Sequence, residues 1–493
     1  MTHDTPLWLI FDVGTSGTKA ALVTPDGDLL RTATHDYPTF SADGGVNEQN
    51  ADDWREAVIA LSRTFSEERS RIAAIVVTGQ MQDAILIEEH GDTTERVILY
   101  SDTRAGAEAA EIEQKLGAER LTALTGNEQG ADSLRAKLLW LSRHRPEALR
   151  RARKIVFGAA DFVTFHLTGN AVTDTTTAST TGLFHLGERR WLEQSIFDEM
   201  GIGVCRSLMP MLVTGGAHVG PLTERAANAL GLKVGLPVYH ATGDAGAATI
   251  GAGSGEIGRA YGYLGTSGWV AFTSDAPGSP MNGVFTLAHP RPDRFIQIAP
   301  LLTAAGNLDW VRGLFPDDPI DALVSAACAR PPSPVIYLPY LNGERTPFRD
   351  PLARAAFIGI NGSTDRLDLV RAVLEGVAFG YRHALEALMP TAPESLILTG
   401  GGTRSAAWCQ LFADVLNKRI LLGSGAEHVG VRGAQITVQV ASGKLGDYAP
   451  PGFPLIDQTL VPDAAQVARY ETKYGVYRAA YPAMKGLFAG LAT

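Results

Sequence analysis

The stretch FDVGTSGTKAALV, residues 11–23, reads as two short apolar strands joined by a glycine-rich turn. The turn itself is GTSG, at residues 14–17. The same tetrapeptide returns at 265–268, between two further strand-like segments at 260–264 and 269–273. The sequence therefore predicts two hairpins that share one turn sequence and lie about half a chain apart.

This repeat predicts two similarly built domains. Its spacing is far longer than the roughly 20 to 50 residues of a solenoid repeat, and 493 residues exceed what one core normally serves. Strands alternate with helices in both halves, which favours α/β layers. Helices are expected over 52–65, 105–116, 134–143, 367–388 and 407–415, and strands over 72–77 and 395–398. The expected boundary follows the small residues at 251–255, giving domains 1–256 and 257–493.

Bulk composition narrows the class of protein. A net charge of -10, with no run of Lys or Arg, argues against binding nucleic acid, so an anionic ligand would have to be held by backbone N–H groups. The three cysteines, Cys205, Cys328 and Cys409, lack metal-ligand spacing, which favours a reducing compartment. No basic leader precedes the first apolar stretch, and no apolar run reaches the ~20 residues of a membrane span. We therefore expect a cytoplasmic protein that binds neither nucleic acid nor membrane.

The GTSG turns are suited to phosphate groups. Glycine allows close approach of the backbone, and the Thr and Ser hydroxyls add donors, so a concave anion site is reasonable. This is not a Walker loop, because GxxxxGK[ST] is absent and the turn leads into a strand. One such turn would be weak support, since ordinary turns share this composition, but two at equivalent points favour a phosphate site.

Two aspartates are candidate catalytic residues. Asp12 ends a strand just before the first turn, where it could hold Mg²⁺ directly or through water, or bond to the N–H groups of its own turn. Asp244 lies among small residues in ATGDAGAATIGAG, at a predicted strand-to-helix turn. It could act as a general base toward a substrate hydroxyl or cap the following helix, and the residues alone divide these evenly.

A third glycine cluster, in LILTGGGTRSAAWCQLFADVL, falls between a strand and a helix. Three glycines there could admit a nucleotide. The spacing is not GxGxxG, so this cluster gives little support to a Rossmann oxidoreductase.

Taken together, these segments resemble the FGGY carbohydrate kinases of the sugar kinase, Hsp70 and actin superfamily. The resemblance covers nearly the whole chain in order. Besides the segments above, it rests on NEQNADDW with Glu48, Gln49 and Trp54, VTGQM, LYSDTRA, TDTTTASTTGLF and YLPYLNGERTPFRDPLARAAFIGI.

The resemblance implies two actin-like (ribonuclease H-like) α/β domains, with sugar and ATP meeting in the cleft between them. It also implies that Asp244 is the catalytic base and that Asp12 organises Mg²⁺. The implied phosphate-lining residues are Gly14, Thr15, Ser16, Gly265, Thr266 and Ser267, and Gly306, Gly401 and Gly402 should lie toward the adenosine. On the sugar side it implies Met81, Gln82, Asp102 and Arg104, together with Asp244.

Within the family, the EQxxxxW, YLxGERTP and GGGxRSxxWxQxxADV patterns are most similar to those of kinases acting on D-xylulose. Two positions depart from this pattern: Gln82-Asp83 replaces the usual His-Gly, and Ala245 replaces Asn. We expect a five-carbon ketose, D-xylulose foremost. The alternatives are another ketose, a polyol or a sugar acid (ribulose, gluconate or an autoinducer-2 type sugar), a non-catalytic nucleotide or sugar sensor, and an actin- or chaperone-like ATPase.

The sequence leaves the oligomeric state open, with a homodimer as one option.

The NGERTP loop contains Glu344 and Arg345. We expect these two residues to form a structural pair near the cleft, in preference to substrate contacts.

Overall fold

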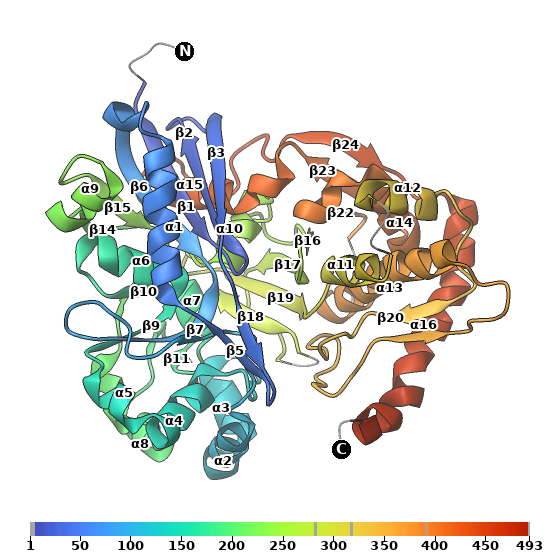
Figure 1. Cartoon of the computed structure of the whole chain (residues 1–493), viewed down its shortest axis with the longest axis horizontal. Coiled ribbons are helices and arrows are strands. Elements are labelled where there is room, and N and C mark those ends of the chain that lie inside the picture. Colours follow the sequence, from blue (N-terminus) through green and yellow to red (C-terminus); the bar gives the residue numbers. More distant parts are fainter. Residues whose placement is uncertain (1–4, 281–282, 316–318, 390, 392, 492–493) are drawn as a thin grey trace.

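The computed structural model describes residues 5–280, 283–315, 319–389, 391 and 393–491 and contains two large sheets flanked by helices (Figure 1). The first sheet has the order β14-β15-β6-β1-β2-β3. Its strands are β1 (Leu7–Val13), β2 (Gly17–Val23), β3 (Leu29–Asp36), β6 (Ile72–Gly79), β14 (Ala217–Pro221) and β15 (Pro237–His240). Helices α1 (Ala51–Thr64), α6 (Ala159–Thr168) and α9 (Glu224–Leu230) pack with this sheet in one buried cluster.

The second sheet has the order β18-β19-β17-β16-β22-β23-β24. Its strands are β16 (Tyr261–Leu264), β17 (Gly268–Ser274), β18 (Phe285–Ala288), β19 (Phe295–Leu301), β22 (Ser395–Thr399), β23 (Arg419–Gly423) and β24 (Ile456–Leu460). The helices of this half are α11 (Gly306–Gly313), α12 (Ile320–Cys328), α13 (Arg366–Leu388), α14 (Ala406–Leu416) and α16 (Ala464–Leu491).

The two sheets share one topology, which confirms the predicted pair of similarly built halves. In the first, β1, β2 and β3 form an antiparallel meander and β6 and β15 continue in parallel beyond β1. In the second, β16, β17 and β19 form the meander and β22 and β23 continue in parallel beyond β16. Each half therefore has the alternating α/β build that the pattern predicted, and the repeated GTSG turn joins the first two strands in both.

An additional lobe extends the first half. A five-stranded sheet, β4-β5-β8-β7-β9, carries β7 (Met81–Ile87) directly after β6. Its other strands are β4 (Phe40–Ala42), β5 (Val46–Gln49), β8 (Val97–Ile98) and β9 (Lys154–Gly158). The helices that share its buried cluster are α2 (Gly106–Leu116), α3 (Ala118–Thr125), α4 (Leu134–His144), α5 (Pro146–Arg151) and α8 (Gln194–Glu199).

Two helices join the halves: α10 (Asp244–Gly251) and α15 (Val429–Ala441). They touch backbone to backbone, because a Cβ added to Gly251 would overlap the carbonyl of Val429 and one added to Gly433 would overlap that of Ala247. Although α15 lies between β23 and β24 of the second sheet in the chain, its apolar face packs on the first sheet, next to β1 and β2 (Figure 1). Helix α10, which begins with Asp244, is therefore packed between the two halves.

The predicted elements agree with the structure to within two residues at their ends. The boundary between domains 1–256 and 257–493 stays a prediction, as α15 crosses back onto the first sheet. Residues 1–4, on which the expected lack of a leader partly rests, lie outside the described residues.

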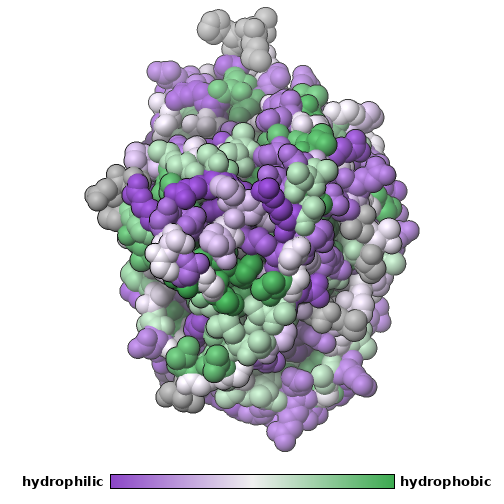
Figure 2. Space-filling view, turned by 90° about the vertical axis from the view of Figure 1, so that its right-hand side faces the viewer, coloured by the Kyte–Doolittle hydropathy of each residue, from purple (hydrophilic) through white to green (hydrophobic). Residues whose placement is uncertain are grey.

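The surface of the molecule bears on its contacts with membranes and partners. Among the described residues, no helix is long and apolar enough to cross a bilayer. On the face that carries much of the second half, hydrophobic side chains gather in small groups among hydrophilic ones (Figure 2). The exposed apolar residues of α16 include Val476, Leu487 and Leu491. A homodimer stays a prediction.

Candidate active site

Asp12 presents a free carboxylate at the end of β1. It is partly exposed and pairs across the hairpin with Lys19 of β2. Its Oδ2 lies against the start of α15, where a Cβ added to Gly430 would overlap it. In the first turn, the N–H of Gly14 donates to the carbonyl of Gly17 (3.1 Å), and within the described chain no turn N–H bonds to the Asp12 carboxylate. The carboxylate is therefore available to a ligand.

Asp244 is the first residue of α10, and the N-cap position belongs to Gly243. The alternative that Asp244 is itself the helix cap is therefore wrong. Its Oδ1 accepts a hydrogen bond from the N–H of Ala245 (2.7 Å), and the side chain is partly exposed. The hydrogen bond orients the carboxylate, and the partial exposure of the residue leaves it able to reach a substrate.

The electrostatics of the two aspartates are linked. Burial, followed by repulsion from Asp12, raises the pKa of Asp244 to about 7. Burial also raises the pKa of Asp12, and the charge of Lys19 partly opposes this. Such a carboxylate can exchange a proton near neutral pH, and the two negative charges together favour a nearby cation.

The structure brings the predicted nucleotide-side glycines together around the second hairpin. The carbonyl of Thr266 accepts hydrogen bonds from the N–H groups of Ala304 (2.8 Å) and Gly306 (3.0 Å), so α11 begins against this turn. A Cβ added to Gly402 would overlap the side chain of Leu264, whereas one on Gly401 would meet open space. These residues therefore lie beside the second hairpin, and their contact with ATP stays a prediction.

The remaining turn residues differ in their surroundings. Ser16 is exposed, and Thr15 donates through its hydroxyl to Oε1 of Gln80 (2.7 Å). The carbonyl of Gly14 accepts a hydrogen bond from the hydroxyl of Tyr37 (2.5 Å). In the second turn, the N–H of Gly265 donates to the carbonyl of Ser267 (3.1 Å). Both turns are therefore held by their own half of the molecule.

On the predicted sugar side, Met81 and Gln82 lie next to the turn that carries Asp244. A Cβ added to Gly243 would overlap the sulfur of Met81, so the two residues are in contact. Gln82 has a φ of 69°, which is uncommon outside glycine, and is 7% exposed. Its Nε2 donates only a long hydrogen bond, 3.4 Å, to the carbonyl of Asp132. The side-chain amide of Gln82 is thus weakly engaged, and Met81 beside it contacts the turn that carries Asp244.

Asp102 and Arg104 are occupied by protein partners. Asp102 is fully buried and accepts from the backbone N–H of Asn47 (2.7 Å) and from Nη2 of Arg104 (2.6 Å). Arg104 also pairs with Glu48 at 2.8 Å. This geometry favours a structural role, so a sugar contact by either residue stays a prediction.

The NGERTP loop contributes a bridge that sequence reasoning missed. The expected contact between Glu344 and Arg345 is made by the backbone N–H of Arg345 (2.8 Å), whereas the guanidinium of Arg345 pairs with another residue. Arg345 and Arg349 both reach Asp132 in the first half, at 2.8 and 2.7 Å, and Arg345 donates to the carbonyl of Tyr100 (3.1 Å). Glu344 is buried and accepts from the N–H groups of Leu302 and Arg345. The loop therefore holds the two halves together beside Gln82, and nothing in the sequence marked Asp132.

A buried pair next to Gln82 was also missed. Asp83 accepts from the N–H of Tyr100 through Oδ1 (3.0 Å), while its Oδ2 has no hydrogen-bond partner in the described chain. Burial raises its pKa despite the charge of Lys137, and burial lowers the pKa of Lys137 to about 8. The two groups lie 54 positions apart in sequence, so no local pattern could relate them.

Comparison with known proteins assigns the family. The model of the FGGY family of carbohydrate kinases, N-terminal domain, matches residues 7–251, and that of the C-terminal domain matches residues 260–441. The xylulose kinase of Escherichia coli (strain K12) is 29% identical over 98% of this chain and 100% of its own length.

Solved structures agree with this assignment. A xyloylose kinase from Brucella ovis is 30% identical, with a TM-score of 0.86 over 98% of this chain and 100% of its own. A gluconate kinase from Lactobacillus acidophilus is 25% identical, with a TM-score of 0.88 over 98% of this chain and 100% of its own. These similarities bear out the two-domain actin-like fold. The chain belongs to the FGGY family of carbohydrate kinases and is an ATP-dependent phosphotransferase with an alcohol group of a sugar as acceptor.

Proposed function

We propose that this kinase transfers the γ-phosphate of ATP to a hydroxyl of D-xylulose, giving D-xylulose 5-phosphate. The observation that carries the proposal is the similarity, across nearly the whole chain, to proteins named xylulose kinase. Met81, which begins the sugar-side segment, contacts the turn that presents Asp244. A small ketose bound there would have a hydroxyl within reach of the base.

A sugar acid is the main alternative substrate, because a gluconate kinase has the same fold. Arg345 and Arg349 share the single carboxylate of Asp132, so this side of the site keeps positive charge that a substrate carboxylate could meet. The substrate panel therefore includes both D-xylulose and D-gluconate.

In the proposed mechanism, Asp244 accepts the proton of the attacking sugar hydroxyl. The hydroxyl oxygen forms a bond to the γ-phosphorus as the bond to the bridging oxygen of ADP breaks, and Asp244 later releases the proton to water. Contact with Ala245 N–H orients the carboxylate. The turns at 14–17 and 265–268 position the phosphates from opposite halves.

Asp12 is the proposed magnesium residue. Its carboxylate is partly exposed and is not bonded by its own turn, which fits a hard cation. When bound, Mg²⁺ would neutralise charge on the phosphoryl group in transfer. Lys19, which faces Asp12 across the hairpin, would add a second positive charge near the phosphates.

A coupled ADP-release assay tests the substrate. The panel is D-xylulose, D-ribulose, D-gluconate and glycerol, and the expected result is the highest kcat/KM with D-xylulose. A higher kcat/KM with another sugar would reassign the substrate. Absence of sugar-dependent ADP release from enzyme that binds ATP would instead support the sensor.

A single variant tests the base. Asp244→Asn should lower kcat by about 10²–10⁴-fold, the usual contribution of a general base, while ATP affinity is retained. Asp198→Asn, on the exposed surface of α8, is the matched control and should keep wild-type turnover. Full turnover of Asp244→Asn would reject the assignment.

A further inference from the structure

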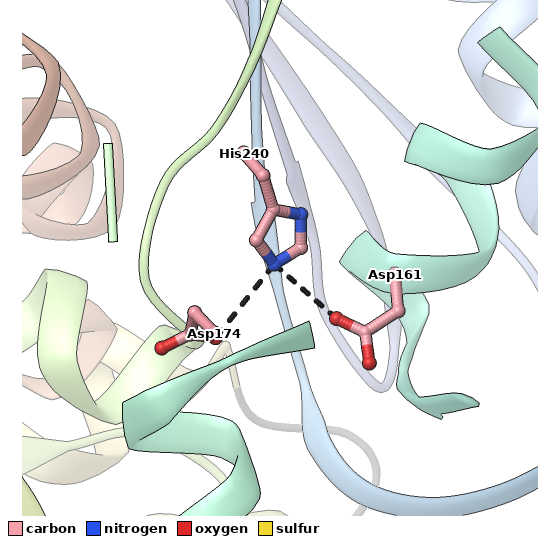
Figure 3. Close-up of side chains that lie close together, drawn as sticks. All are labelled: Asp161, Asp174 and His240. Atoms are coloured by element: carbon pink, nitrogen blue, oxygen red, sulfur yellow. Dashed lines mark ion pairs between the residues drawn. The ribbon is translucent and has the colours of Figure 1, made fainter. Parts of the chain in front are cut away.

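Three ionisable side chains, here called the ion triad, lie buried close to the Asp244 turn (Figure 3). Asp161 comes from α6, Asp174 precedes and caps α7 (Thr175–Ser179), and His240 ends β15. Nε2 of His240 is 3.2 Å from Oδ1 of Asp161 and 3.7 Å from Oδ2 of Asp174. All three are fully buried, so water cannot compensate their charges.

The surroundings of His240 favour its charged form. Nδ1 lies 3.0 Å from the hydroxyl of Thr164, and both ring nitrogens of an imidazolium can donate. Burial alone lowers the pKa of His240, but the two carboxylates outweigh it and raise the pKa to about 9. Its sheet partners, Ala217 of β14 and Val77 of β6, carry no charge, and among the described residues Asp161 and Asp174 are the charged groups that act on His240.

Asp174 connects the ion triad to the catalytic base. Its Oδ1 accepts a hydrogen bond from the hydroxyl of Thr242 (3.1 Å), and its Oδ2 accepts from the N–H of Gly243 (3.2 Å). Gly243 immediately precedes Asp244 and caps α10. An ionised Asp174 therefore anchors the backbone from which the base projects.

We propose that His240 is a positioning residue for Asp244: its cation keeps Asp174 ionised beside Asp161, and ionised Asp174 fixes the Thr242–Gly243 turn. The inference rests on the proposed role of Asp244 as the base. Burial raises the pKa of both carboxylates, and His240 is the strongest of the influences that lower them, so without its cation Asp174 takes up a proton more readily. A protonated Asp174 would lose an acceptor, and small displacement of a reacting group is costly in rate.

Charge swaps within the ion triad test this. His240→Gln should lower kcat by up to about 100-fold with KM for ATP unchanged. Asp161→Asn removes the competing carboxylate, so the double variant Asp161→Asn/His240→Gln should recover much of the lost kcat. His383→Gln, on α13 and packed against Tyr474 and Tyr477, is the matched histidine control and should retain wild-type kcat.

The pH profile gives a second readout that packing alone would not move. Because His240 loses its proton above pH of about 9, wild-type kcat should decline there, and His240→Gln should lack this decline. Two results would overturn the proposal. One is a wild-type kcat in His240→Gln, and the other is a relative kcat of the double variant that is no higher than the product of the relative kcat values of the two single variants.

A metal ion bound by the three side chains is the competing possibility. Elemental analysis of the purified full-length enzyme distinguishes the two. One equivalent of metal in the wild type that is absent from His240→Gln would overturn the proposal that His240 acts as a cation. A negative result for the ion triad would leave the proposed role of Asp244 as the base unaffected, because Asp244→Asn tests that role separately.

Discussion

The two GTSG hairpins have the same turn sequence but differ in register and in side chains. In the first, Val13 pairs with Thr18 across the turn, whereas in the second Leu264 pairs with Gly268, so the second turn is one residue tighter. Two positions before each turn, the first hairpin has Asp12 and the second has Tyr263. A duplicated backbone has thus come to carry a carboxylate on one side and an aromatic ring on the other.

The surroundings of the two hairpins match this difference. Asp12 faces Lys19, whereas Tyr263 stacks on Trp269 with ring centroids 4.2 Å apart. Burial raises the pKa of Tyr263 and the charges of Asp12 and Asp244 add to this, so its hydroxyl is neutral. In the proposed function, the first hairpin therefore supplies charge to the site, and the second supplies backbone donors and packing.

The largest expected effect is at the paired positions themselves. Asp12→Asn should lower kcat by about 10²–10³-fold, the range for losing one group that stabilises charge in the transition state. Tyr263→Phe removes a neutral hydroxyl and should cost less than about tenfold, since its ring stacking remains. Steady-state kinetics at saturating ATP and sugar measure both. Equal losses would show that the hairpins share one role.

A matched pair of glycines gives the next largest effect. Gly430→Ala would press on the carboxylate of Asp12, and Gly402→Ala on the side chain of Leu264 beside the second turn. We expect about a tenfold lower kcat from the first and about a tenfold higher KM for ATP from the second, each equivalent to about 1.4 kcal/mol. Separate titrations of ATP and sugar distinguish them. If Gly402→Ala lowered kcat and Gly430→Ala did not, the roles assigned to the two hairpins would be reversed.

The pH dependence offers a smaller and more specific test. In the free enzyme, repulsion from Asp12 contributes to the raised pKa of Asp244, about 7. Asp12→Asn removes that repulsion, so Asp244 should deprotonate at lower pH, whereas Tyr263→Phe should leave its pKa nearly unchanged. Carbon-13 NMR of the Asp244 carboxyl in each variant measures the shift directly. An unchanged pKa in Asp12→Asn would mean that burial alone sets it.

Much of this arrangement was predictable because it is local in sequence. The apolar strands around each GTSG, and the helix over 366–388 with its Asp365 capping box, follow from periodicity and caps. The position of Asp244 between a strand and a small-residue helix could likewise be read directly.

What escaped prediction depends on contacts between distant segments. The Arg345–Asp132 bridge joins residues more than two hundred positions apart, and Asp161, Asp174 and His240 come from three separate elements. No residue pattern encodes such pairings, because they arise only when the lobe, the sheet and the loop pack together. Lys19 is the exception: pairing across the hairpin places it opposite Asp12, and the spacing around the turn could have indicated this.

The smallest expected effect is on stability, and it separates the charged site from the aromatic hairpin. The folded pKa of Asp244 is raised to about 7 from its ordinary 3.8, so between these values the native state binds a proton that the unfolded state does not. Stability therefore falls as pH rises through this window, and the penalty is complete above pH 7. Asp244→Asn, which cannot ionise, should raise Tm by about 2–4 °C at pH 8, an estimate kept low because Asp244 is partly exposed.

That gain should shrink as the pH is lowered toward 5, because wild-type Asp244 then regains its proton. Tyr263→Phe removes a group that is neutral across this range and should show no such pH-dependent gain. Differential scanning calorimetry at pH 5 and pH 8 on the wild type and both variants makes the comparison. A gain of equal size at both pH values would mean that Asn packs better than Asp, and that the charge of Asp244 carries no cost to the fold.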